Sequence, residues 1–330
     1  MVRYSIEIGQ QEQDILKEID IEKLKLYPNS DGEELRHALA KYHGLKDEQV
    51  FLGNGSDEVL ALTFLTFFNG SDPVLFPNIS YSFYPVYCDL YQMNYKEIIL
   101  DQDFKMYVED FKQPNSGIIF PNPNAPTGLL VSLDFIEEVL KSNPDSIVVV
   151  DEAYIELSSN PDVKSMVSEI SDDTNVVVAR TFSKLYGLAG VRLGYAMCNK
   201  EMHAILQKCT SVFTGSRVAL AGAMAALDDE EYIKKTKAAM LEGRKYLTDE
   251  FTKMGFYVYP SETNFLYVNT GYNAAEFAEE CKKYGLIIRG NFDYSRITVG
   301  RMDQNEKMVG IIKNYVYDTP WQSGEIYRFQ

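Results

Sequence analysis

The residue best suited to covalent chemistry is Lys184, which stands in the segment RTFSKLYGLAGVRLGY at positions 180–195. A lysine that follows a buried strand among small and apolar residues can be desolvated, and desolvation favours the neutral amine that acts as a nucleophile. Ser183 and Arg192 add a hydroxyl and a guanidinium group, which both suit a phosphate. A lone lysine is usually a solvated surface residue, but this context favours a nucleophile beside an anion.

A second candidate is the segment GNGSDE at positions 53–58, which follows a short apolar run. Its two glycines let the backbone approach a ligand closely, and the start of a helix offers free N–H groups to an anion. It is not a dinucleotide fingerprint, because Glu58 occupies the place of the third glycine, and it is not a P-loop. Taken alone, such a pattern is more often an ordinary turn between a strand and a helix.

A third candidate is the segment Asp151-Glu152-Ala153-Tyr154, which follows the apolar residues 147–150. Acidic residues at the end of such a strand need a partner if they are buried. Taken alone, the pattern is more often a helix-capping aspartate or a magnesium ligand. All three candidates follow predicted strands, and open α/β sheets bind their ligands at the carboxyl ends of strands.

The elements that carry these segments are predicted to form an α/β fold with a mostly parallel central sheet. Short runs rich in Val and Ile, without alternation, indicate strands that are covered on both faces. Helical patterns lie between them, which is typical of parallel α/β layers. The predicted strands are residues 50–52, 73–76, 98–100, 117–120, 147–150, 176–179 and 194–197.

The segments before and after the predicted strands of the sheet show other patterns. Residues 30–33, Ser-Asp-Gly-Glu, predict a capping box before a helix that places Leu35, Leu39 and Tyr42 on one face and stops at Gly44. The C-terminal part predicts a smaller α+β domain, with helices at 228–254, 273–284 and 304–315 and strands at 256–259, 264–268, 286–289 and 296–299. We therefore expect an N-terminal segment 1–27, a large domain 28–227 and a small domain 228–330.

The amino-acid composition limits the kinds of molecule that this protein is expected to bind. The 330 residues include 32 Lys+Arg and 48 Asp+Glu, a net charge of −16, which disfavours binding to nucleic acid or an anionic membrane surface. There is no signal-peptide pattern, no run long enough to span a membrane, and no CxxC pair among the four cysteines, so we expect a cytoplasmic protein. His37, His43 and His203 complete no metal site, and the first two are expected to be solvated.

Taken together and in order, the motifs resemble the fold-type I aminotransferases that use pyridoxal 5′-phosphate (PLP), and among them the histidinol-phosphate aminotransferases. The resemblance runs from about residue 27 to residue 299. It rests on Tyr27-Pro28, GNGSDE, an aromatic residue after a strand at Tyr81, PNAPTG at 123–128, DEAY at 151–154, the lysine segment, and RITVG at 296–300. Family members usually begin with an Asn-Glu-Asn-Pro-like stretch that helps to cover the substrate, and none occurs here.

The resemblance implies a role for each matching residue. Lys184 would bind PLP covalently and then move the proton between substrate and cofactor. Asp151 would keep the pyridine nitrogen protonated. Tyr154 would hydrogen-bond the phenolic oxygen, a role that Asn124 would share, although relatives commonly have a second asparagine where this chain has alanine. Tyr81 would stack on the ring.

The phosphate of PLP would be held by a further set of residues, namely Gly55, Ser56, Asp57, Thr181, Ser183 and Arg192. Tyr27 would reach the phosphate in the neighbouring subunit, which implies a homodimer with shared active sites. In the small domain, Arg296 would bind the α-carboxylate of glutamate or the phosphate of the substrate, with Arg289 assisting. Bidentate guanidinium geometry suits both anions, whereas two surface arginines paired with acids are the simpler alternative.

The function implied by the resemblance is transamination between a small-molecule amino donor, L-histidinol phosphate, and a 2-oxo acid, 2-oxoglutarate. Two other PLP reactions stay open, namely decarboxylation of a phosphorylated amino acid of the threonine-phosphate type and transamination of aromatic amino acids. A PLP-binding regulatory protein is a further alternative. Such proteins normally carry a DNA-binding module, and none is visible in this acidic chain.

Overall fold

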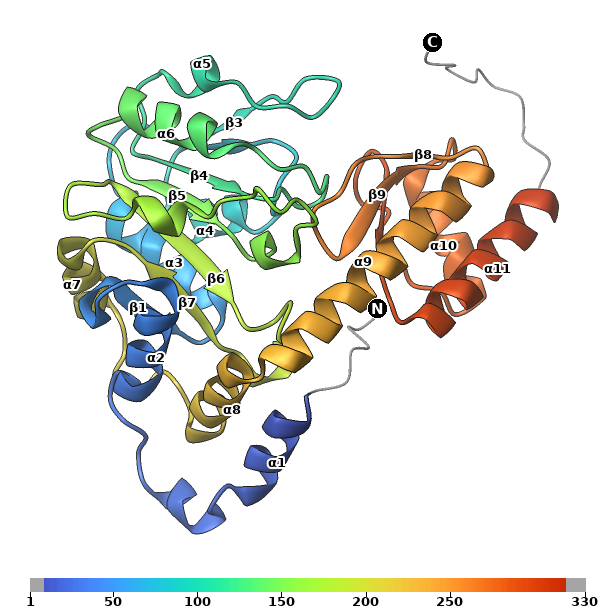
Figure 1. The fold of residues 1–330 in the computed structure, drawn as a ribbon. Coiled ribbons are helices and arrows are strands. Elements are labelled where there is room, and N and C mark those ends of the chain that lie inside the picture. The colour runs from blue at the N-terminus through green and yellow to red at the C-terminus, as the bar shows by residue number, and fades with distance from the viewer. Residues whose placement is uncertain (1–8, 319–330) are drawn as a thin grey trace.

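The computed structural model describes residues 9–318, which form a large seven-stranded sheet and a small three-stranded sheet, both flanked by helices (Figure 1). The order of the large sheet is β1-β7-β6-β5-β4-β2-β3. The four neighbouring pairs from β6 to β3 are parallel, and β7 is antiparallel to β1 and β6. The predicted mostly parallel sheet is therefore confirmed. Its strands are β1 (Val50–Gly53), β2 (Val74–Pro77), β3 (Tyr95–Ile98), β4 (Gly117–Pro121), β5 (Val148–Asp151), β6 (Val176–Thr181) and β7 (Gly194–Met197).

Burial of both faces explains why the strands are continuous apolar runs. Successive residues of β5 alternate between two hydrophobic clusters, because Val148 and Val150 face one cluster and Val149 faces the other. Each cluster buries the apolar sides of a different set of helices. The first face carries α2 (Glu33–His43), α6 (Leu133–Ser142) and α8 (Arg217–Asp228), and the second carries α3 (Ser56–Phe67), α4 (Tyr84–Tyr91) and α7 (Lys200–Cys209).

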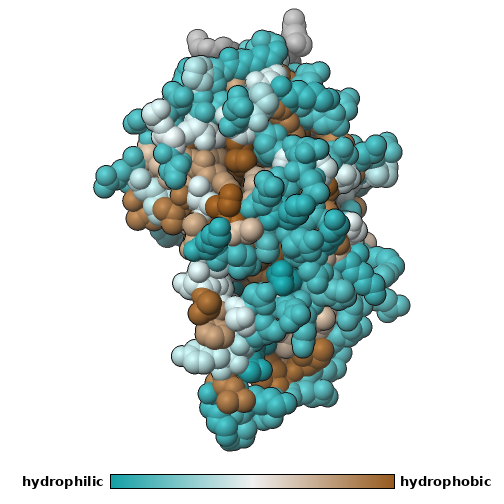
Figure 2. Space-filling model, turned by 90° about the vertical axis from the view of Figure 1, so that its left-hand side faces the viewer, coloured by the Kyte–Doolittle hydropathy of each residue, from teal (hydrophilic) through white to brown (hydrophobic). Residues whose placement is uncertain are grey.

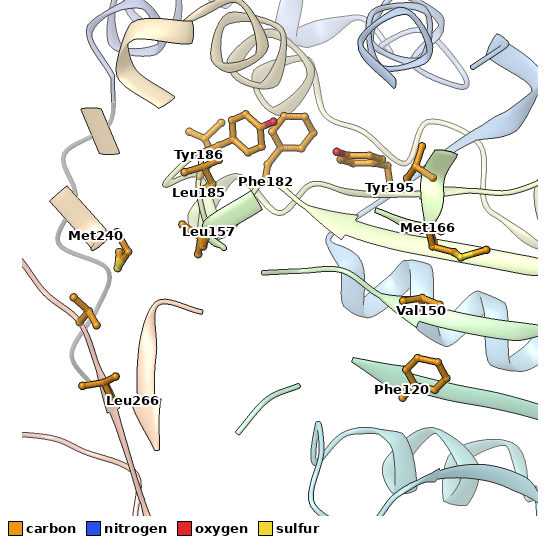
Figure 3. Packing of buried hydrophobic residues seen from close by; sticks show 14 of the residues in the cluster. Phe120, Val150, Leu157, Met166, Phe182, Leu185, Tyr186, Tyr195, Met240 and Leu266 are labelled. Atoms are coloured by element: carbon orange, nitrogen blue, oxygen red, sulfur yellow. The ribbon is translucent and has the colours of Figure 1, made fainter. Parts of the chain in front are cut away.

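The small sheet is antiparallel and has the order β10-β9-β8. Three of its buried residues, Leu266, Val268 and Ile297, belong to the same cluster as one face of the large sheet. Leu266 of β9 and Met240 of α9 thus share one core with Leu157 (Figure 3). The long helix α9 runs from the large sheet to the small one (Figure 1). The elements of this part are α9 (Glu230–Lys253), β8 (Tyr257–Val258), β9 (Phe265–Asn269), α10 (Ala274–Lys283), β10 (Ser295–Thr298) and α11 (Met302–Asp318).

Short helices fill the connections. They are α1 (Gln10–Glu18), α5 (Val108–Phe111) and the 3-10 turns η1 (Ile21–Lys25), η2 (Asp47–Gln49), η3 (Ile155–Leu157), η4 (Met166–Glu169) and η5 (Ala189–Val191). Among residues 9–318, no helix is long and apolar enough to cross a membrane. No group of His, Cys, Asp and Glu side chains in the same residues is arranged to hold a metal ion.

Three expectations for the helix α2 and the residues before it were wrong. The N-cap of α2 is Gly32 at φ 64°, with no side-chain cap, so Ser30 lies two residues before the N-cap and the expected capping box does not form; Asp31 pairs with Arg36. Tyr42 is 53% exposed and does not share the buried face of Leu35. His43 is not solvated either: its ring contacts the Tyr195 hydroxyl at 3.1 Å, and burial lowers its pKa to about 3.

Three other boundaries also differ from the sequence-based prediction. The helix expected at 228–254 is confirmed as α9 but begins two residues later, at Glu230, because Asp228 ends α8 and the Asp229 side chain caps α9 through the Tyr232 N–H. The strand expected at 98–100 lies earlier, at β3. The strand expected at 286–289 is reduced to a single bridge between Arg289 and Arg296.

Candidate active site

One cavity of about 270 Å³ lies at the carboxyl ends of β5 and β6 and is closed by residues of the small-sheet region. It is the place where an open α/β sheet is expected to bind its ligand. Most of the predicted site residues line it, although they come from segments far apart in the chain. These are Ser56, Asp57, Tyr81, Asp151, Tyr154, Thr181, Ser183, Lys184, Arg192, Arg289 and Arg296.

The anion-binding end of the cavity is formed by the start of α3. The N-cap of α3, Gly55, has φ 89° and provides no side-chain cap, so the first N–H groups of the helix have no capping partner from this residue. The positive φ at this position favours glycine, and a Cβ here would lie 2.7 Å from the Arg192 guanidinium, which would have to shift. The start of a helix and a guanidinium group therefore face the same point.

Asp57 organises this end of the cavity by accepting hydrogen bonds through its carboxylate. Arg192 Nη2 lies 2.9 Å from one carboxylate oxygen, and the Tyr81 hydroxyl donates to the other at 2.7 Å. The Tyr87 hydroxyl donates to the Asp57 carbonyl at 3.0 Å. The side chain of Asp57 is thus an acceptor that orients Arg192 and Tyr81, and only its backbone can donate to an anion.

Asp151 is a buried carboxylate at the end of β5. It accepts a hydrogen bond from the Ala153 N–H at 3.1 Å and one from the Tyr84 hydroxyl at 3.2 Å. Burial raises its pKa to about 6, against the opposing effects of these two bonds and of the nearby Lys184. An additional cation in the cavity would stabilise the ionised form.

Tyr84 was missed by sequence reasoning, although a signal for it exists. It stands three residues after Tyr81, at the start of α4, so both rings lie on one side of that helix start. Their centroids are 5.5 Å apart in an edge-to-face arrangement. One of the two hydroxyls reaches Asp57 and the other reaches Asp151.

Lys184, Arg289 and Arg296 also line the cavity. Lys184 Nζ lies 5.0 Å from the centroid of the Tyr154 ring, which packs edge-on against Phe265 at 5.2 Å. Arg296 packs over the same Phe265 ring, with its guanidinium carbon 4.9 Å from the ring centroid. Burial lowers the pKa of Arg296, and its Nε has no hydrogen-bond partner among the described residues.

Three predicted residues lie outside the cavity lining, namely Gly55, the N-cap of α3 described above, Asn124 and Tyr27. Asn124 is buried behind it, where its amide nitrogen donates to the Ile79 carbonyl and the Thr127 hydroxyl at 2.9 Å each, and its neighbour Ala125 lines the cavity. Its Oδ1 is buried without a partner among the described residues. Tyr27 is 77% exposed and stacks on Phe213 at 4.6 Å, away from the cavity of its own chain.

Residues 4–312 match the model of the family described as "Aminotransferase class I and II". This chain belongs to that family. Histidinol-phosphate aminotransferase 1 of Pseudomonas aeruginosa is 41% identical over 295 residues, which cover 87% of this chain and 83% of that protein. Histidinol-phosphate aminotransferase of Acinetobacter baylyi is 41% identical and is matched over 89% of this chain and 82% of its own length.

Solved structures agree on the fold. The histidinol-phosphate aminotransferase from Clostridium acetobutylicum superposes with a TM-score of 0.88 over 96% of this chain and 98% of that chain, at 24% identity. The enzyme from Sinorhizobium meliloti, in complex with pyridoxal-5′-phosphate, superposes with a TM-score of 0.85 over 95% and 90%, at 21% identity. The predicted aminotransferase fold, enzyme class and PLP cofactor are confirmed.

The cavity fits PLP on its own chemistry. A primary amine, a buried acid and an anion site are present together, as Lys184, Asp151 and the start of α3 beside Arg192. The protonated ring nitrogen of PLP would supply a cation for Asp151, whose buried carboxylate otherwise has only neutral hydrogen-bond donors. The buried Oδ1 of Asn124 also has no hydrogen-bond partner among the described residues.

We expect the PLP-free protein to lose stability through Asp151 as the pH rises from about 4 to about 6. The pKa of the folded state is raised from 3.8 to about 6, so the folded protein holds this proton more tightly than the unfolded one. The resulting stabilisation is complete below 3.8 and lost as the pH passes through about 6. At about 1.4 kcal/mol per pKa unit, the change is on the order of 3 kcal/mol.

Chemical denaturation at pH 4 to 7 would measure this change. Asp151→Asn cannot ionise, so its free energy of unfolding should vary less with pH than that of the parent. The exposed Asp162→Asn is a matched control that should keep the parental profile. A profile for Asp151→Asn parallel to that of the parent would contradict the assignment.

Proposed function

We propose that this enzyme transfers the amino group of L-histidinol phosphate to 2-oxoglutarate, giving imidazole-acetol phosphate and glutamate, a step of histidine biosynthesis. The observation that carries the proposal is the placement of Arg289 and Arg296 on the cavity that also contains Lys184. Two guanidinium groups suit the phosphate of the amino donor in one half-reaction and the carboxylates of the 2-oxo acid in the other. The names of the relatives support this choice of substrate.

The charge of the cavity supports the same choice. The chain as a whole has a net charge of −16, but the cavity is lined by four basic side chains and two acidic ones. The acidic ones are Asp57, which pairs with Arg192, and Asp151, which lies beside the proposed position of the ring nitrogen. Positive charge thus remains for the anionic groups of the two substrates.

The residues of the chain divide the chemistry between them. Bound PLP supplies the electron-accepting ring. Lys184 would hold the cofactor covalently; once the amine of the substrate has displaced it, its free amine would accept the proton from the substrate Cα and return it to C4′ of the cofactor. Asp151 would keep a proton on the ring nitrogen, Tyr154 would hydrogen-bond the phenolic oxygen, and Tyr81 would stack on the ring. Asn124 does not share the role of Tyr154 in this arrangement, because its amide nitrogen already donates to Ile79 and Thr127.

Phosphate binding is assigned to one group of residues, which would act mainly through N–H and O–H donors. The Arg192 guanidinium and the first backbone N–H groups of α3 supply the positive end of this site. The group consists of Gly55, Ser56, Asp57, Thr181, Ser183 and Arg192. The phosphate or carboxylate of the substrate would bind Arg296, with Arg289 assisting.

The test of the function is turnover of a panel of amino donors by the purified, PLP-loaded enzyme. Glutamate formation from 2-oxoglutarate is expected to be faster with L-histidinol phosphate than with aromatic amino acids as donor, with no CO₂ released from phosphorylated amino acids. In Lys184→Ala, turnover should fall by at least ~10⁴-fold, because both the covalent link and the proton transfer are lost. Borohydride should fix the cofactor onto Lys184 in the parent only. Undiminished turnover by Lys184→Ala would exclude the mechanism.

Arg296→Gln should weaken binding of the phosphorylated donor by about 10- to 100-fold in KM, since a charge-assisted hydrogen bond contributes about 1.5–3 kcal/mol. Steady-state kinetics with L-histidinol phosphate measure this effect. Arg301→Gln is the control, because Arg301 pairs with Asp303 and does not line the cavity. Equal KM values for the two variants would contradict a substrate-binding role for Arg296.

We further propose that the enzyme is a homodimer in which Tyr27 reaches the phosphate site of the partner subunit. Tyr27 is 77% exposed, and its neighbourhood is unusually apolar for a surface. Figure 2 shows hydrophobic residues on the surface at the narrow lower end of the molecule, where this N-terminal segment lies in Figure 1. The exposed apolar residues of this region are Ile21, Leu24, Leu26, Tyr27, Val212 and Phe213.

Sedimentation equilibrium should therefore give twice the chain mass of 37.6 kDa. A charge at Leu24, which is 50% exposed, should shift the protein toward monomer, because it would be buried in the interface without a partner. The same change at Ile99, which is 71% exposed after β3, serves as the control. A monomeric parent, or equal effects of Leu24→Glu and Ile99→Glu, would count against this interface.

A further inference from the structure

Two short segments, 151–157 and 180–186, carry reactive side chains on one side and a buried polar network on the other. Tyr154 and Lys184 line the cavity from these two segments. The residues on the opposite side do not line the cavity and bond to one another instead. They are Glu152, Glu156, Arg180 and Tyr186.

Arg180 is the centre of this network. Its Nη2 and Nε lie 2.9 and 3.1 Å from one carboxylate oxygen of Glu152, and its Nη1 lies 3.4 Å from Glu156 Oε1. The Tyr186 hydroxyl donates to the same Glu156 oxygen at 3.0 Å. The side chains of Arg180, Glu152 and Glu156 are only 6%, 0% and 16% exposed. The four groups thus form one connected, desolvated unit.

The network is anchored to the scaffold at its other end. The Ser165 hydroxyl and the Met166 N–H donate to the two oxygens of Glu152 at 2.6 and 2.8 Å. Replacing a buried ion pair by well-packed apolar residues often leaves a protein equally stable, so such a pair is weak evidence for a stabilising role. What the network does supply is a fixed relative position for the two segments.

The hydrogen bond from the Tyr186 hydroxyl to Glu156 connects the turn that carries Lys184 to the turn that carries Tyr154. Tyr186 stands two residues after Lys184, in a turn closed by the Gly187 N–H donating to the Lys184 carbonyl at 3.1 Å. Glu156 lies in η3, whose Leu157 N–H donates to the Tyr154 carbonyl at 2.9 Å. Figure 3 shows Tyr186 and Leu185 above Leu157 in the hydrophobic core.

We propose that Glu156 and Tyr186 are positioning residues that hold the Lys184 turn against the Tyr154 turn. Lys184 Nζ is 5.0 Å from the centre of the Tyr154 ring, and the network fixes this spacing from behind. The proposal rests on the proposed role of Lys184 toward PLP, but it does not depend on which amino donor the enzyme uses. Neither Glu156 nor Tyr186 lines the cavity.

The test uses Tyr186→Phe, which keeps the ring and removes only the hydroxyl, and Glu156→Gln, which removes the charge opposite Arg180. In the PLP-loaded enzymes, kcat should fall about tenfold while KM for the amino donor stays within about twofold, because misplacing a reacting group slows proton transfer more than it weakens binding. The pH midpoint of the absorbance of the bound cofactor should also shift by about half a unit or more, because the environment of Lys184 changes.

Tyr107→Phe is the matched control. It removes a tyrosine hydroxyl that donates to a carboxylate, Asp101, at 2.6 Å, but on the surface and outside the cavity. It should leave kcat and the absorbance midpoint unchanged. If Glu156→Gln does not fold, Tyr186→Phe alone decides the question.

Parental kcat and midpoint in Tyr186→Phe would overturn the proposal. So would a lower melting temperature with an unchanged midpoint, because that result is expected of a purely structural role. The absorbance titration needs no substrate. A wrong choice of amino donor would therefore abolish turnover in the parent as well, and it would leave this readout intact.

Discussion

Burial of β5 and β6 on both faces is the constraint on which the site depends. Because Val148–Val150 and Val176–Val178 are fully buried, polar side chains are placed only where these strands end. Parallel neighbours end at the same edge, so Asp151 and Thr181 open onto one cavity. Polar chemistry is thereby confined to a single edge of an otherwise apolar layer.

The reverse sides of the same strand ends show how that edge is kept rigid. Glu152 and Arg180 are adjacent in sequence to Asp151 and Thr181, and they pair with each other on the side away from the cavity. A buried ion pair needs good geometry to offset its desolvation, and that requirement limits the positions that the two strand ends can take. The reactive side and the supporting side are therefore coupled through the backbone.

The shared core explains how Arg296, from the small sheet, reaches a cavity built by the large one. Leu266 and Ile297 of β9 and β10 lie in the same hydrophobic cluster as Leu157 of η3. That packing holds the strand bearing Arg296 next to the turn bearing Tyr154. The result is a local excess of basic side chains in a chain whose net charge is −16.

The sequence alone determined the α/β class, the buried strands and the main reactive residues, because apolar runs and the motifs around Lys184 and Asp151 are local patterns. Local patterns also misled in places: Gly32, not Ser30, caps α2, and Tyr42 is exposed. The residue at which a helix begins and the face that it buries depend on packing between elements, which a capping motif does not contain.

Only the tertiary structure decided which side chains meet across long sequence separations. The Tyr84 hydroxyl reaches Asp151, and the Tyr186 hydroxyl reaches Glu156, through the way helices and turns pack around the sheet ends. The side chain of Asp57 turned out to accept from Arg192 and Tyr81, because the three come together from separate segments. Residue types and spacing specify what a segment can do, whereas the partners of each side chain follow from three-dimensional packing.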